Sequence, residues 1–99
     1  MMKEKGQLLK ANGTECEVRP KNGTDFSLEE LQGFVGGYVE PIYFHDGYML
    51  VLKDDAYLDA DKQVNETATE LVKQHGIGFI FPEEKVWGDA LFCKEELVK

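Results

Sequence analysis

The sequence predicts a single α+β domain over residues 1–99, with a mainly antiparallel sheet of about five or six strands and two helices on one face. Three observations predict this class. Short apolar segments are joined by Asn-Gly and Asp-Gly pairs, which favour tight hairpin turns. Two other segments repeat apolar residues at helical spacing. The 99 residues suffice for one modest hydrophobic core, and the expected order is ββ-α-ββ-α-ββ.

The first expected element is a hairpin near the N-terminus. Residues 7–10 and 15–19 flank the dipeptide Asn12-Gly13, and glycine adopts the positive φ of a tight turn at little cost. Pro20 follows the second segment and ends it, because proline has no backbone N–H to donate to a neighbouring strand.

A helix is expected to begin directly after Ser27. The stretch from Ser27 to Glu30 matches a capping box, in which the serine hydroxyl accepts from the Glu30 N–H and the glutamate side chain accepts from the Ser27 N–H. Gly36 is expected to end this helix, because glycine adopts the left-handed conformation that follows many helices.

A second hairpin is expected at residues 38–44 and 48–52, joined by Asp46-Gly47. Pro41 lies inside the first of these segments. This position predicts that the strand lies at an edge of the sheet or carries a bulge there. The second segment is apolar on both of its faces, which predicts burial on both sides.

The C-terminal half predicts one more helix and two short strands. Apolar residues share one stripe over residues 62–75, and Gly76 is expected to end this helix. Residues 78–81 read as a short strand, and a last strand is expected within residues 86–93.

The chain is acidic, with 19 acidic and 11 basic side chains and a net charge of −8. This charge disfavours direct binding to nucleic acids and to anionic membranes. It is compatible with a basic protein partner, and it also serves solubility.

The two cysteines and the N-terminus predict a cytoplasmic location. Cys16 and Cys93 lie far apart, so they indicate neither a disulfide framework nor a zinc site. The first six residues lack the apolar core of a signal peptide, and no apolar run reaches the length of a membrane span.

Several short motifs together resemble an uncharacterised domain family of bacteria, phages and conjugative elements. They are Val35-Gly36-Gly37-Tyr38-Val39-Glu40, the acidic pair Asp54-Asp55, Asn65-Glu66-Thr67-Ala68-Thr69 and Gly88-Asp89-Ala90-Leu91. The match covers roughly residues 33–93 and depends on the order and spacing of the motifs. The resemblance implies a fold and a mobile-element setting, and it implies no activity.

No complete catalytic motif or metal site is predicted, so the chain is not expected to be an enzyme or to hold a cofactor. The nearest approach to a metal site is the acidic stretch that begins at Asp55. As a calcium-binding loop it would need an acidic residue and a glycine where Tyr57 and Ala60 stand.

Six residues are candidates for a binding site. Glu40, Asn65, Thr69 and Asp89 are polar residues within segments that define the fold. They predict either a polar network that holds the second helix against the sheet or a small pocket for a ligand or a peptide end. Tyr43 and Trp87 are candidate anchors for a protein partner, since both residue types are enriched at binding hot spots.

Three functions are compatible with these observations. The first is a small non-catalytic protein-interaction module of a mobile element, which binds a protein partner or self-associates. The second is an acidic DNA mimic that inhibits a DNA-binding host enzyme, motivated by the net charge of −8. The third is a small nucleotide- or ligand-binding domain that would use Glu40, Asp89 or His45.

Overall fold

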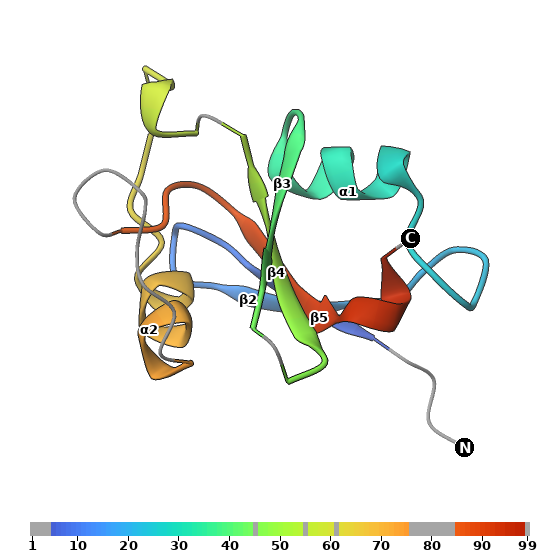
Figure 1. Ribbon diagram of the computed structural model, residues 1–99. Helices are drawn as coiled ribbons and strands as arrows, with labels where there is room; N and C mark the ends of the chain where they lie inside the picture. Colours follow the sequence, from blue (N-terminus) through green and yellow to red (C-terminus); the bar gives the residue numbers. More distant parts are fainter. Residues whose placement is uncertain (1–4, 45, 55, 61, 76–84, 99) are drawn as a thin grey trace.

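Five strands form one antiparallel sheet with the spatial order β2-β1-β5-β4-β3 (Figure 1). The computed structural model describes residues 5–44, 46–54, 56–60, 62–75 and 85–98. The strands are β1 (Gly6–Leu9), β2 (Glu15–Val18), β3 (Val39–Tyr43), β4 (Tyr48–Lys53) and β5 (Ala90–Lys94), and the helices are α1 (Leu28–Val35) and α2 (Glu66–Gln74). Two 3-10 turns, η1 (Ala56–Leu58) and η3 (Glu95–Leu97), complete the described elements. The predicted α+β class and the antiparallel sheet are confirmed.

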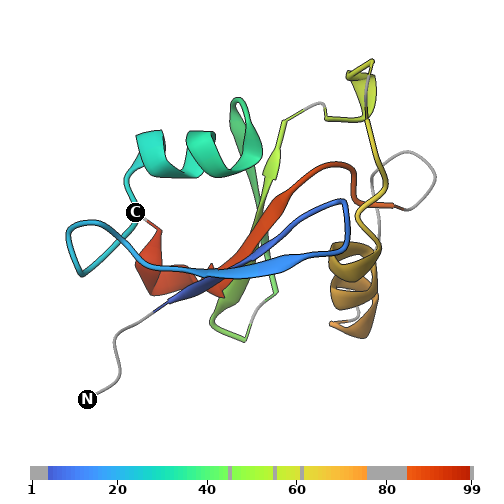
Figure 2. The same ribbon diagram turned by 180° about the vertical axis from the view of Figure 1, so that it is seen from behind.

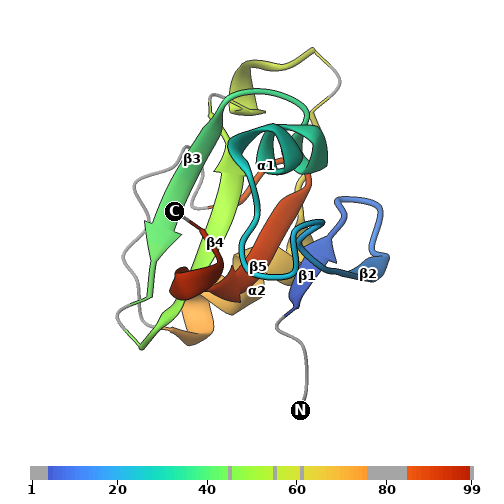
Figure 3. The same cartoon turned by 90° about the vertical axis from the view of Figure 1, so that its right-hand side faces the viewer.

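The two helices lie on opposite faces of the sheet, so the prediction that both cover one face is wrong (Figures 1 and 3). Alternate residues of β4 point to opposite sides. Met49 and Val51 share a buried cluster with α1, whereas Leu50 and Leu52 share another with Ala68 of α2. Both faces of β4 are apolar, so each must be buried by another element. The sequence pattern does not indicate which helix packs on which face.

The capping box of α1 is confirmed. The Ser27 hydroxyl accepts from the Glu30 N–H at 3.1 Å, and the Glu30 carboxylate accepts from the Ser27 N–H at 2.8 Å. The Ser27 N–H and the Lys21 N–H both donate to this carboxylate, and they hold the pKa of Glu30 below its usual value. Gly36 ends the helix with a φ of 87°, as the sequence predicts.

Strand β3 is an edge strand, which confirms the prediction made from Pro41. The Phe44 N–H donates to the Tyr48 carbonyl, so residues 45–47 separate the pair and the loop is one residue longer than a two-residue turn. Hydrogen-bonded and non-hydrogen-bonded pairs alternate from there along the hairpin. The Pro41–Val51 pair is therefore not hydrogen-bonded, and the proline nitrogen faces the open edge of the sheet.

Helix α2 begins at Glu66, four residues later than the sequence predicts. The side chain of Asn65 accepts from the Ala68 N–H and caps the helix. The preceding residue, Val64, forms an isolated antiparallel bridge with Trp87, so the chain is extended there. The strand predicted at residues 78–81 and the cap predicted at Gly76 lie outside the described residues.

None of the helices in the described part of the chain combines the length and the apolar content that a membrane span requires.

Candidate functional site

Asn65 lies at the centre of a buried polar network. Its side-chain amide donates to the carbonyls of Leu9 and Gly88, both at 2.8 Å, and its side-chain oxygen accepts from the Ala68 N–H at 3.0 Å. The residue has no exposed surface. Both amide hydrogens and the amide oxygen are thus used by the protein itself.

Thr69 and the segment before β5 extend this network. The Thr69 hydroxyl accepts from the Val86 N–H at 2.9 Å, and the Asn65 N–H donates to the Val86 carbonyl at 2.7 Å. Asp89 accepts from the Ala11 N–H at 2.9 Å. These contacts join the start of α2, the β1–β2 turn and the start of β5, which meet at one end of the sheet (Figures 1 and 2).

The network supports the structural interpretation of Asn65, Thr69 and Asp89. Each side chain bonds to backbone groups of a segment that is distant in sequence. Satisfied polar groups of this kind specify how a helix docks on a sheet. They leave the Asn65 amide no free N–H donor for a ligand, and the residue is fully buried.

The other three candidates take no part in the hydrogen bonds described above for Asn65, Thr69 and Asp89. Glu40 and Tyr43 belong to β3, where Glu40 is paired with Leu52 and Tyr43 is about half exposed at 49%. Trp87 pairs with Val64, and its ring lies 5.8 Å from the Lys62 ammonium. Trp87 thus lies in the segment that contains Val86 and Gly88, whereas Glu40 and Tyr43 lie on the edge strand β3.

The described residues contain no group of three or more His, Cys, Asp or Glu side chains that could hold a metal ion. Two members of the acidic stretch considered above, Asp55 and Asp61, lie outside that part of the chain.

The two thiols differ strongly in environment. Burial raises the pKa of the Cys93 thiol to about 12, because a thiolate is poorly solvated in an apolar core. Cys16 is exposed on β2. We expect a thiol reagent such as dithionitrobenzoate, at mildly alkaline pH, to modify Cys16 rapidly in the native protein and Cys93 only after unfolding. Rapid modification of Cys93 in the folded Cys16→Ser variant, or of two thiols per chain in the native wild type, would contradict this expectation.

Strand β2 lies at one end of the sheet and has an open edge, which no sequence motif indicates. The Lys10 N–H donates to the Thr14 carbonyl, so that pair is hydrogen-bonded. Hydrogen-bonded and non-hydrogen-bonded pairs alternate along two antiparallel strands, so the backbone groups of Cys16 and Val18 bind β1. The N–H and C=O groups of Glu15 and Glu17 therefore point away from the sheet, and both residues are exposed.

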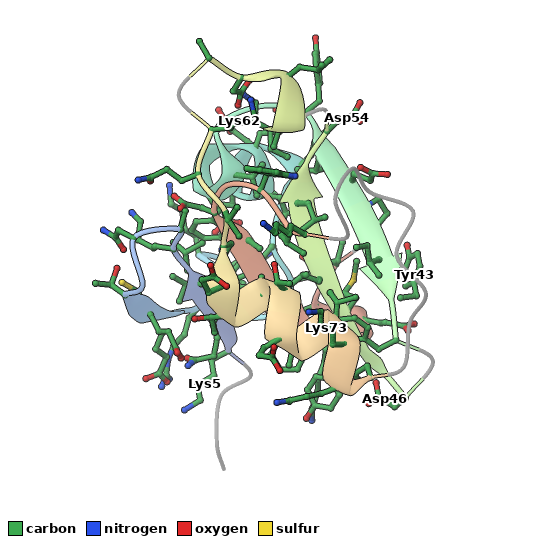
Figure 4. The ribbon with its side chains drawn as sticks, turned by 90° about the vertical axis from the view of Figure 1, so that its left-hand side faces the viewer. Lys5, Tyr43, Asp46, Asp54, Lys62 and Lys73 are labelled. Atoms are coloured by element: carbon green, nitrogen blue, oxygen red, sulfur yellow. The ribbon has the colours of Figure 1, made fainter. Side chains whose placement is uncertain are left out.

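A groove lies beside this edge, between α2 and the strands β1, β2 and β5, on the face seen in Figure 4. Its volume is about 360 Å³. Apolar side chains of Leu9, Leu71 and Phe92 line it together with the acidic side chains of Glu15 and Glu70. An open strand edge and a groove therefore adjoin each other on this part of the described chain.

Comparisons of the chain with protein-family models, with curated proteins and with solved structures found no match.

Proposed function

We propose that the protein is a small non-catalytic module that binds another protein through the open edge of β2. The observation that carries this proposal is the outward orientation of the Glu15 and Glu17 backbone groups. Unpaired N–H and C=O groups on an exposed edge strand are a template for an added strand from a partner. The sequence resemblance supports a mobile-element setting, and the two cysteines, far apart in the sequence, support a cytoplasmic one; both are part of the same proposal.

The two edges of the sheet differ in a way that supports a specific role for β2. At the β3 edge, Pro41 presents a nitrogen without a hydrogen, which prevents a partner strand from pairing there. At the β2 edge, residues 15–18 include no proline. One edge is thus protected against strand addition, and the other is open to it.

The distribution of acidic side chains favours this proposal over a DNA mimic. A mimic needs its carboxylates on one elongated face. Here acidic residues lie on both faces and at both ends of the sheet. Examples are Glu15 and Glu17 on β2, Glu29 and Glu30 on α1, Asp46 in a turn, Glu66 and Glu70 on α2, and Glu95 and Glu96 on η3. Several of these carboxylates are already paired or cap a helix, as Glu17 and Glu30 are.

A photo-crosslinking experiment tests the proposal, because the chain supplies an exposed thiol on β2. A benzophenone maleimide attached to Cys16 is expected to crosslink one defined protein on irradiation in an extract of the source cell. That protein, once purified, is expected to bind the unlabelled chain saturably at a fixed stoichiometry. The matched control carries the probe on Leu58→Cys in a Cys16→Ser background, since Leu58 is exposed in η1, outside the β2 edge.

Equal crosslinking from both positions, or no saturable protein partner, would contradict a binding module at β2. A thermal-shift screen with nucleotides and divalent metals distinguishes the ligand-binding alternative. A saturable rise in Tm with any of these small molecules would favour that alternative.

A further inference from the structure

We infer that β2 binds an extended basic peptide segment as an added strand, with a lysine or arginine side chain beside Glu15 and Glu70. This inference rests on the proposed function and names the chemistry of the partner. Three features of the described residues carry it: the register of β2, the unneutralised carboxylates and the apolar groove.

The register determines which partner residues face the groove. An added strand would form its hydrogen bonds with Glu15 and Glu17, whose backbone groups point outward. Side chains directly opposite each other in an antiparallel pair share a face of the sheet. The partner residue opposite Glu15 therefore projects on the α2 side, next to the groove.

The charges on that side favour a cation. Glu70 forms no ion pair with any described residue, and Glu15 has one weak contact there, from the Gln7 amide at 3.5 Å. Glu17 differs, since Lys5 and Arg19 both lie 2.9 Å from its carboxylate. The two carboxylates that line the groove thus remain available to a lysine or arginine of the partner.

The groove suits the rest of such a side chain. Leu9, Leu71 and Phe92 provide an apolar floor, and the volume of about 360 Å³ is large enough for a long side chain. Lysine and arginine pack their methylene stems on apolar surfaces while the charged group remains at a polar rim. The apolar residues of the groove would therefore contact the methylene stem, and the acidic side chains at its rim would contact the charged group.

A second copy of the chain is a poor occupant of the same edge. Two β2 strands that pair would place Glu15 opposite Glu15 or Glu17 of the other copy. Like charges directly opposite each other destabilise a strand pair. A basic peptide forms the same backbone bonds with charge attraction instead of repulsion.

Fluorescence anisotropy with defined peptides tests the inference. A short fluorescein-labelled peptide of alternating Lys and Thr is expected to bind saturably, whereas a peptide of alternating Glu and Thr is not. The variant Glu15→Lys/Glu70→Lys is expected to bind the basic peptide about tenfold more weakly or worse. The matched control Glu95→Lys/Glu96→Lys has the same net charge on η3, outside the residues that line the groove, and is expected to retain the affinity.

Two further measurements test strand addition itself. Two versions of the basic peptide are compared, one N-methylated at its odd-numbered residues and one at its even-numbered residues. Only one of the two is expected to lose binding, because an added strand pairs through alternate N–H groups. Glu17→Pro removes an outward N–H without breaking a β1–β2 hydrogen bond, and it is expected to weaken binding while the circular dichroism spectrum stays native.

Equal affinity loss in the Glu15/Glu70 and Glu95/Glu96 variants would overturn the inference, because it indicates nonspecific charge attraction. Insensitivity to N-methylation and to Glu17→Pro would overturn it as well. If the crosslinked partner binds through β2 but the basic peptide does not bind, this inference fails and the proposed function stands. If neither crosslinking nor peptide binding occurs, both fail.

Discussion

Replacing Asn65 with alanine is expected to lower the free energy of unfolding by about 3 kcal/mol or more. The substitution removes the cap of α2, and it leaves the Leu9 and Gly88 carbonyls without their donor. A buried polar group that loses its partner costs its full desolvation free energy. Urea unfolding followed by circular dichroism measures the difference.

Asn12→Ala is the matched control, because Asn12 also accepts backbone and side-chain hydrogen bonds but is exposed. Its expected cost is about 1 kcal/mol or less, since water replaces the lost contacts. Asn65→Asp separates the two roles of the side chain: it keeps the capping oxygen and loses both donors. If Asn65→Ala costs no more than Asn12→Ala, the network does not hold α2 in place.

Replacing Leu91 with alanine is expected to cost about 2–5 kcal/mol, the usual range for a buried leucine. Leu91 has no exposed surface and lies on β5, the central strand, where it is paired with Leu8 and Val51. It belongs to the cluster beneath α1. The cavity would therefore open at the centre of the sheet, where the neighbouring strands have little freedom to close it.

Leu58→Ala is the control for Leu91→Ala, because it deletes the same atoms from a side chain that is 70% exposed. We expect a change within about 0.5 kcal/mol. Similar midpoints in urea for the two variants would show that the cluster beneath α1 is not the core that the structure indicates.

The elements that the sequence predicted best depend on local physical chemistry. The capping box of Ser27 and Glu30 needs only residues within one turn, so it could be recognised without any tertiary information. Pro41 likewise indicated an edge strand, because the missing N–H is a property of the residue itself. In contrast, the start of α2 was predicted too early, since the bridge between Val64 and Trp87 joins residues distant in sequence.

The candidate site was predicted only in part, for a related reason. Asn65, Thr69 and Asp89 could be singled out as polar residues among apolar ones, but their partners are backbone groups of other segments. The pattern of side chains in the sequence does not indicate which backbone group will become the hydrogen-bond partner of a polar residue. The open edge of β2 could not be predicted from the sequence. The N–H and C=O groups that point outward belong to Glu15 and Glu17, whose side chains are typical of any exposed surface.

The amino-acid sequence by itself determined where the first helix begins and ends, where the hairpins turn and which strand avoids further pairing, because each depends on neighbouring residues. The tertiary structure alone decided that the helices cover opposite faces and that β2 remains open. Residues such as Met49 and Leu50 make both faces of β4 apolar, and either helix could satisfy either face. The strand order and the chain connections select one arrangement, and that selection leaves β2 at the edge with its groove beneath α2.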